Sequence, residues 1–140
     1  GKENRYCYNC YADEDRVIPA DKSKHDWSSW YVTRKATALK DGQVKRECYN
    51  CGRSETKVLS KLKARVTLKT KKKILKKGKS FVLKLKKYTD GDKIFKFSSS
   101  NKKIAKVSTK GKVVARKKGK VKITVTMKSG CKAACTVVVK

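Results

Sequence analysis

The second half of the chain alternates apolar and polar residues with a period of two, the pattern of a β-strand that is buried on one side. The pattern is clearest in residues 121–128, which read Val-Lys-Ile-Thr-Val-Thr-Met-Lys. Glycine-containing pairs that favour turns separate this run from similar ones. We expect strands near residues 64–69, 73–76, 80–88, 93–98, 103–108, 112–117, 121–128 and 133–139. Short strands with regular turns are typical of a β-sandwich or barrel, so the expected fold class is mainly β.

Two other structures for this half are weighed against strands. Lysine favours helices, but the β-branched residues within 121–126 lose rotamer freedom on a helix and favour a strand. A high lysine content also suits a disordered chain. The regular alternation argues against disorder, because it supplies one continuous apolar face.

Three short blocks in this half occur in the order and spacing of a known family. They are Ser-Ser-Asn at 99–101, Ile-Ala-Lys-Val at 104–107 and Gly-Lys-Val-Val-Ala at 111–115. Residues 64–140 thereby resemble the group 2 bacterial immunoglobulin-like domain. The resemblance implies a small β-sandwich that occurs in repeats on bacterial surface proteins, adhesins and some phage proteins as a spacer or binding module. It brings no catalytic residues.

Charge divides the chain into two parts. The formal net charge is +29, and residues 57–140 hold 29 basic side chains against only Asp90 and Asp92. Residues 1–56 hold 11 basic and 9 acidic side chains, together with most of the aromatic residues and four of the six cysteines. We expect two domains, 1–60 and 61–140, with the boundary between Val58 and Ala64.

The lysines of the second part must point outward if the apolar face points inward. A surface of one sign attracts polyanions in a salt-dependent way. The candidates are anionic wall polymers, acidic glycans, anionic lipid surfaces and nucleic acid; a merely solvated surface is the plain alternative. Lysines far outnumber arginines here, and lysine lacks the fork that reads bases, which favours diffuse attraction over sequence-specific binding.

The first part contains two copies of the sequence Cys-Tyr-Asn-Cys. Their cysteines are Cys7, Cys10, Cys48 and Cys51. Four thiolates complete the tetrahedral shell of a structural zinc ion, and we expect zinc as the cofactor. Two disulfides are the alternative, because surface proteins live outside the reducing cytosol. A redox-active pair is the third reading, although no βαβ pattern surrounds either copy. A segment this short with few aliphatic residues needs such a staple.

The order of motifs in residues 5–58 resembles a short repeat of bacterial surface proteins: Cys-x-x-Cys, His-x-Trp, Ala-Thr, Gly, then Cys-x-x-Cys-Gly. The usual cysteine after Ala-Thr is missing, because Ala38 follows Thr37. This departure leaves four cysteines, an even and sufficient ligand set. The first domain is therefore expected to be a small cysteine-clamped, zinc-ribbon-like module.

His25 is the only histidine. With four thiolates available a fifth ligand is superfluous, so His25 is expected to pack beside Trp27 rather than to bind the metal. Trp27, Trp30 and Tyr31 are a candidate ligand surface on which a sugar stacks, although a small module also needs large aromatic residues for its core.

Cys131 and Cys135 lie four residues apart near the end of the chain. On a regular strand their Cα atoms would be about 13 Å apart, beyond the roughly 7 Å that a disulfide allows. A bulge at residues 132–134 would permit a disulfide between them. The two outcomes at this site are a local bridge and two free thiols.

We expect a non-enzymatic module of a bacterial cell-surface or secreted protein, serving adhesion, ligand presentation or spacing. The extracellular location rests on the resemblance. The expected partners are anionic envelope polymers or glycans, or host surface molecules, and the chain is expected to be a monomeric fragment of a larger protein. No apolar run approaches a transmembrane length, and no signal peptide is expected in this sequence. The alternative is a zinc-ribbon protein whose basic domain grips nucleic-acid phosphates.

Overall fold

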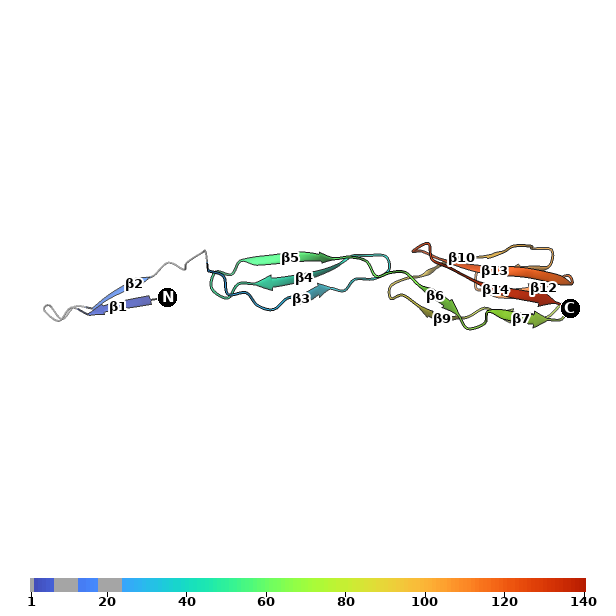
Figure 1. The fold of residues 1–140 in the computed structure, drawn as a ribbon, viewed down its shortest axis with the longest axis horizontal. Coiled ribbons are helices and arrows are strands. Elements are labelled where there is room, and N and C mark those ends of the chain that lie inside the picture. The colour runs from blue at the N-terminus through green and yellow to red at the C-terminus, as the bar shows by residue number, and fades with distance from the viewer. Residues whose placement is uncertain (1, 7–12, 18–23) are drawn as a thin grey trace. The chain divides into compact units, whose positions relative to one another are not determined.

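The computed structural model describes residues 2–6, 13–17 and 24–140, and every regular element in this part of the chain is a β-strand (Figure 1). The expectation of a mainly β fold is confirmed. The chain divides into two compact units. Unit 1 consists of Gly1–Arg34 and Gln43–Val58, and unit 2 of Lys35–Gly42 and Leu59–Lys140.

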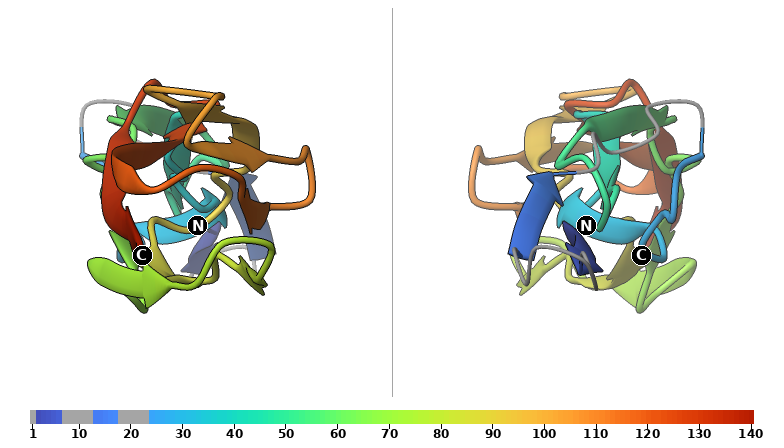
Figure 2. Two further views of the ribbon diagram at one scale, coloured as in Figure 1. Left: turned by 90° about the vertical axis from the view of Figure 1, so that its right-hand side faces the viewer. Right: turned by 90° about the vertical axis from the view of Figure 1, so that its left-hand side faces the viewer.

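The largest sheet of unit 2 has four strands in the order β10-β13-β14-β7. They are β10 (Ile94–Ser99), β13 (Gly119–Met127), β14 (Lys132–Val139) and β7 (Lys72–Leu75). Strands β13 and β14 form an antiparallel hairpin in which Ile123 pairs with Cys135, while β7 pairs with β14 in parallel (Figures 1 and 2). The hairpin lies at the centre of the sheet because β10 and β7 flank it.

Two smaller sheets complete unit 2. One has the order β11-β12-β8, and the other pairs β6 with β9. Their strands are β11 (Ala105–Val107), β12 (Lys112–Ala115), β8 (Ser80–Val82), β6 (Val66–Leu68) and β9 (Leu85–Tyr88). Their inward side chains and those of the four-stranded sheet form one apolar core, which is the arrangement of an immunoglobulin-like β-sandwich.

The alternation seen in the sequence explains this core. Along β13 the side chains of Val121, Ile123, Val125 and Met127 are buried, while Lys120 and Lys122 are exposed. Burying one such side chain contributes about 1.5–3 kcal/mol. The lysine content is compatible with a folded domain because the lysines occupy the other face of each strand.

The segment expected as one strand, residues 80–88, forms two. Strand β8 pairs with β12, whereas β9 pairs with β6. Between them, the backbone amide of Leu83 donates to Gly111, and Lys84 accepts a hydrogen bond from Lys69. The chain thus passes from one small sheet to the other at residues 83–84, a change that alternation alone cannot reveal.

Gly111 lies directly before β12 in a conformation that glycine favours. Its φ is +78°, and a Cβ there would lie 3.0 Å from Cζ of Phe97 and 3.1 Å from the carbonyl oxygen of Leu83. A larger residue would therefore meet both backbone strain and a packed neighbour. The glycine lets β12 run close beneath β10, with Val113 and Ala115 pointing into the core.

Unit 1 consists of two small sheets. It contains the hairpin of β1 (Lys2–Tyr6) and β2 (Asp13–Val17) and a three-stranded sheet in the order β3-β4-β5. The strands of this sheet are β3 (Tyr31–Arg34), β4 (Gly42–Glu47) and β5 (Ser54–Leu59). Among residues 24–34 and 43–58, Cys48 is the one buried hydrophobic side chain. This part of unit 1 therefore has no apolar core of its own.

The loop between β3 and β4 belongs to unit 2. Ala38 donates a backbone hydrogen bond of 2.9 Å to Asp90, and Leu62 donates one of 2.9 Å to Thr37. Gly91 has a φ of +71°, and a Cβ there would lie 2.6 Å from Cβ of Thr37. Residues 35–42 therefore pack closely on the turn between β9 and β10.

Candidate metal centre

The second Cys-x-x-Cys sequence lies at the tip of the β4–β5 hairpin. Cys48 follows β4 directly, and its amide donates 2.8 Å to the carbonyl of Arg53, while Gly52 donates 3.0 Å back to Cys48. Gly52 has a φ of +67°, which allows the chain to turn tightly after Cys51. The turn holds the side chains of Cys48 and Cys51 on the same small loop.

A neighbouring segment brings His25 to this loop. Trp27 forms an antiparallel bridge with Cys48, and the amide of Tyr49 donates 2.8 Å to the carbonyl of Asp26. Ser28 and Glu47 form two hydrogen bonds. The amide of Ser28 donates to the carbonyl of Glu47, and the hydroxyl of Ser28 accepts from the amide of Glu47. These contacts lay residues 26–28 alongside residues 47–49 and fix the position of His25.

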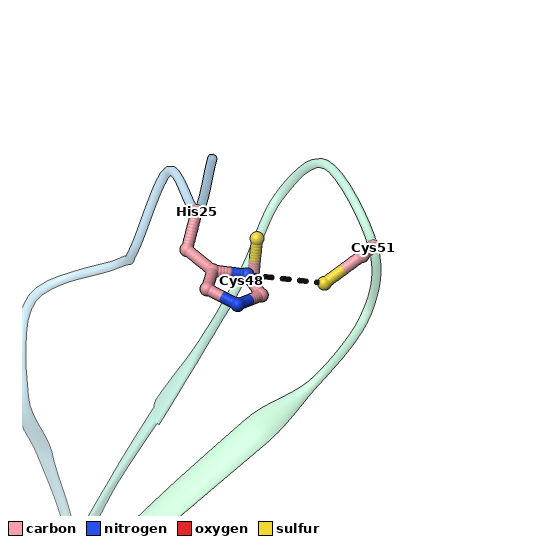
Figure 3. Close-up of side chains that lie close together, drawn as sticks. All are labelled: His25, Cys48 and Cys51. Carbon is pink, nitrogen blue, oxygen red and sulfur yellow. Dashed lines mark hydrogen bonds between the residues drawn. The ribbon is translucent and has the colours of Figure 1, made fainter. Parts of the chain in front are cut away.

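The three side chains form a compact donor set (Figure 3). Nδ1 of His25 lies 3.4 Å from Sγ of Cys51, and the ligand atoms of His25, Cys48 and Cys51 all lie within 4.8 Å of one another. In a tetrahedral zinc site the donor atoms are about 3.5–3.8 Å apart, as the usual Zn–S and Zn–N bond lengths require. The group is therefore close enough to hold a metal ion after a small contraction.

The electrostatics of the loop favour a thiolate. Burial opposes ionisation of Cys48, which is 3% exposed. Hydrogen bonds from the side chain of His25 and from the backbone amides of Cys51 and Asn50 outweigh burial and lower the pKa of Cys48 to about 6. A thiolate is the form in which cysteine binds metal, so the loop favours the form of Cys48 that a metal ion would require.

Two of the four expected ligands, Cys7 and Cys10, lie outside the described residues. Cys48 and Cys51 are brought together as free thiols, and the four-sulfur site stays a prediction. His25 was expected to pack beside Trp27, and the two rings do lie in contact with centroids 4.9 Å apart. The structure also places His25 against the sulfurs, which the count of available thiolates gave no reason to expect.

The candidate ligand surface is occupied by cationic side chains. The guanidinium of Arg46 lies 4.4 Å from the ring centre of Trp27 and 4.8 Å from that of Trp30, and Nζ of Lys57 lies 4.4 Å from Trp30. Arg46 also makes two short contacts to Glu55. These cation–π contacts hold β4 against residues 27–30, where the described residues form no apolar core to do so.

Tyr31, the third residue of that surface, stands apart from these contacts. It begins β3, is 43% exposed and pairs with Lys45 of β4. Burial and the neighbouring Glu47 carboxylate raise the pKa of its hydroxyl. Whether the three aromatic residues bind a ligand stays a prediction.

Cys131 and Cys135 are free thiols in the structure, and the bridge considered between them is not formed. The register of β13 and β14 is unbroken from Gly119–Val139 to Thr126–Lys132, so the bulge that a bridge requires does not occur. Cys135 points into the core and is fully buried. Burial raises the pKa of its thiol.

Comparison with known proteins identifies the family of the chain. Residues 64–137, more than half of the sequence, match the family described as bacterial Ig-like domain (group 2). The chain belongs to this family, as the three sequence blocks implied. The match leaves the resemblance of residues 5–58 to a surface-protein repeat a prediction.

No curated protein matches the chain. Among solved structures, it is similar to the crystal structure of the S-layer protein SbsC domains 4 and 5, with 15% identity and a TM-score of 0.42. The match covers 71% of this chain and spans 57% of the length of that one. Within the part of the chain that the structure describes, there is no helix long and apolar enough to cross a membrane.

Proposed function

We propose that the chain is a non-enzymatic module of a bacterial cell-surface or secreted protein, in which a metal-clamped unit precedes a basic immunoglobulin-like domain. The family supports the surface location and a role in spacing, presentation or adhesion. The apolar core of unit 2 supports a structural role as well. Its buried polar residue, Asp92, is fully engaged in hydrogen bonds to Ser129 and Lys93.

The metal of unit 1 is proposed to be zinc, bound by His25, Cys48, Cys51 and a fourth ligand from Cys7 or Cys10. Two sulfurs and an imidazole suit zinc better than magnesium or calcium, which prefer oxygen ligands. A closed tetrahedral site of this kind is structural rather than catalytic. The geometry of the three described ligands is the observation that carries this part of the proposal.

The basic domain is proposed to bind anionic polymers of the cell envelope. The proposal is supported by the charge of residues 57–140, which contain 29 basic and two acidic side chains. The strand pattern displays these lysines on the surface, so a long anionic polymer meets many positive charges at once. Adhesion through this surface does not require a shaped pocket.

The proposed function is tested by binding the full chain to immobilised polymers at physiological salt. Binding to an acidic polymer should exceed binding to neutral dextran by at least about tenfold, and it should fall as salt rises. Equal retention on both polymers would contradict the anionic-polymer role. Much tighter binding to DNA or RNA than to heparin at matched salt would favour the nucleic-acid alternative instead.

A further inference from the structure

One end of the sandwich in unit 2 carries basic residues and no acidic ones. Three connections and the last residue meet there: β7–β8, β10–β11, β12–β13 and Lys140. Backbone hydrogen bonds join Lys77 to Lys140, Gly78 to Ala115, and both Arg116 and Lys117 to Ile104. In Figure 1 the C-terminus and the end of β7 lie together at this end of unit 2, and the left view of Figure 2 looks onto it.

We define the basic pole as the nine basic residues of these segments. They are Lys76, Lys77, Lys79, Lys102, Lys103, Arg116, Lys117, Lys118 and Lys140. All nine are exposed, and within the described part of the chain none of their side chains forms an ion pair. The segments 76–79, 101–104 and 115–119 contain no acidic residue.

The acidic residues of unit 2, Asp41, Asp90 and Asp92, lie at the opposite end. Asp41 belongs to the loop 35–42, which packs on the turn between β9 and β10. Asp90 and Asp92 precede β10, whereas Lys102 and Lys103 follow it. The six residues of β10 span about 16 Å at the usual rise of a strand, which is more than the roughly 8 Å over which physiological salt screens exposed charges. The pole is therefore not neutralised by these carboxylates.

A hollow of about 280 Å³ adjoins the pole where β10 and β11 meet. Its lining residues are Phe97, Ser98, Ser99, Lys102, Lys106 and Val107. Ser99 donates its hydroxyl hydrogen to Ala105 at 2.7 Å, and the side chain of Asn101 accepts from the amide of Lys103 at 3.0 Å. The loop is thus held in shape, with Lys102 and Lys106 facing a recess that also contains the exposed Ser98.

The composition of the pole suits a phosphate polymer without bases. Eight of the nine residues are lysines, which bind phosphate as point charges. Proteins that hold single-stranded nucleic acid also stack bases on aromatic side chains. The exposed aromatic residues of unit 2, Tyr88 and Phe95, lie before and at the start of β10, at the acidic end.

We propose that the basic pole and the adjoining hollow bind a flexible polyol-phosphate polymer, with one phosphate seated between Lys102 and Lys106. This inference deepens the proposed function and rests on it, because it assigns the anionic polymer to one end of the domain. Several phosphates along one polymer contact the pole together. Each neutralised phosphate releases counterions, which makes the binding steeply dependent on salt.

Two variants of the full chain with equal net charge test the proposal. The pole variant carries Lys77→Gln, Lys79→Gln, Lys102→Gln, Lys103→Gln and Lys117→Gln. The control variant carries Lys63→Gln, Lys86→Gln, Lys87→Gln, Lys93→Gln and Lys128→Gln, all exposed and outside the pole. The probes are poly(glycerol phosphate), single-stranded DNA and neutral dextran at one salt concentration. Unchanged amide spectra of the core would show that both variants are folded.

The pole variant should bind poly(glycerol phosphate) at least about tenfold more weakly than the unmodified chain, with a shallower salt slope, and the control variant less than about twofold more weakly. Equal losses in the two variants would contradict binding at the basic pole while leaving the proposed function intact. Tighter binding of DNA than of poly(glycerol phosphate) would overturn the assigned polymer. If the unmodified chain binds no anionic probe better than dextran, the proposed function itself fails.

Discussion

Nδ1 of His25 lies 3.4 Å from Sγ of Cys51, although the two residues are 26 positions apart in the chain. The bridge between Trp27 and Cys48 brings the two segments together. The imidazole is therefore part of the same loop structure as both sulfurs, and its contact with the ring of Trp27 fixes its orientation.

Replacing His25 with Ala should weaken zinc binding by more than about 100-fold, because loss of even an outer-shell partner of a ligand costs 10–100-fold. Cys51→Ser should have a similar effect, whereas Cys131→Ser, which lies in unit 2, should leave zinc binding unchanged. Competition with a chromogenic chelator measures these affinities. If His25→Ala binds zinc as tightly as the unmodified chain, four sulfurs suffice and the histidine only packs.

Gly91→Ala should destabilise unit 2 by more than the usual cost of a left-handed alanine, which is about 1–2 kcal/mol. The new Cβ would lie 2.6 Å from Cβ of Thr37, so the loop 35–42 must move. Gly130→Ala is the matched control, since its φ is +84° and nothing lies within 4 Å of its added Cβ. Urea unfolding of both variants gives the difference. Equal destabilisation would mean that the loop does not pack on the β9–β10 turn.

Asp92 should make the stability of unit 2 depend on pH in the acid range. Asp92 is 4% exposed. Burial opposes its ionisation, but hydrogen bonds from Ser129 and from the amide of Lys93 outweigh burial and lower the pKa of Asp92. Because the folded-state pKa is depressed, the stabilisation is complete above the unfolded value near 3.9 and is lost as the pH falls through the folded-state pKa.

Asp92→Ala tests this role by urea unfolding at several pH values. The variant should lose about 1–3 kcal/mol at neutral pH, because the hydroxyl and amide of Ser129 and the amide of Lys93 lose their acceptor. The stability difference from the unmodified chain should shrink below pH 4. A difference that stays constant down to pH 2 would mean that the charge of Asp92 does not matter.

Cys131 and Cys135 should differ sharply as thiols. In the native chain a thiol reagent should modify Cys131, which is half-buried at the β13–β14 turn, far faster than the fully buried Cys135. Cys135→Ser should destabilise unit 2 by about 1–3 kcal/mol, since it places a hydroxyl in the core, and Cys131→Ser should be nearly neutral. If neither thiol reacts after denaturation without reductant, the two cysteines form a disulfide.

Alternation and glycine positions predicted most of the strands of unit 2. Residues 121–128 and 133–139 correspond closely to β13 and β14, because both strands are long and buried on one face. The segment 80–88 shows the limit of this reasoning. Phe81, Leu83 and Leu85 keep their alternation while the chain changes from one sheet to another. The alternation of apolar and polar residues does not indicate which strand pairs with which.

The candidate metal centre was predicted only in part. Cys48 and Cys51 follow from their spacing, which is a local feature. His25 depends on a long-range pairing, and the count of cysteines pointed away from it. The charge pattern likewise placed residues 1–60 in one domain, whereas the loop 35–42 packs within unit 2 through contacts to Asp90, Gly91 and Leu62. Such contacts form only when distant segments meet.

We propose that an apolar core holds unit 2 together while a metal ion holds unit 1. Amide hydrogen exchange of the zinc-loaded full chain, before and after removal of the metal by a chelator, tests it most directly. We predict that protection of residues 43–58 collapses while that of residues 119–139 is unchanged. Protection of residues 43–58 that survives complete removal of the metal would contradict the account.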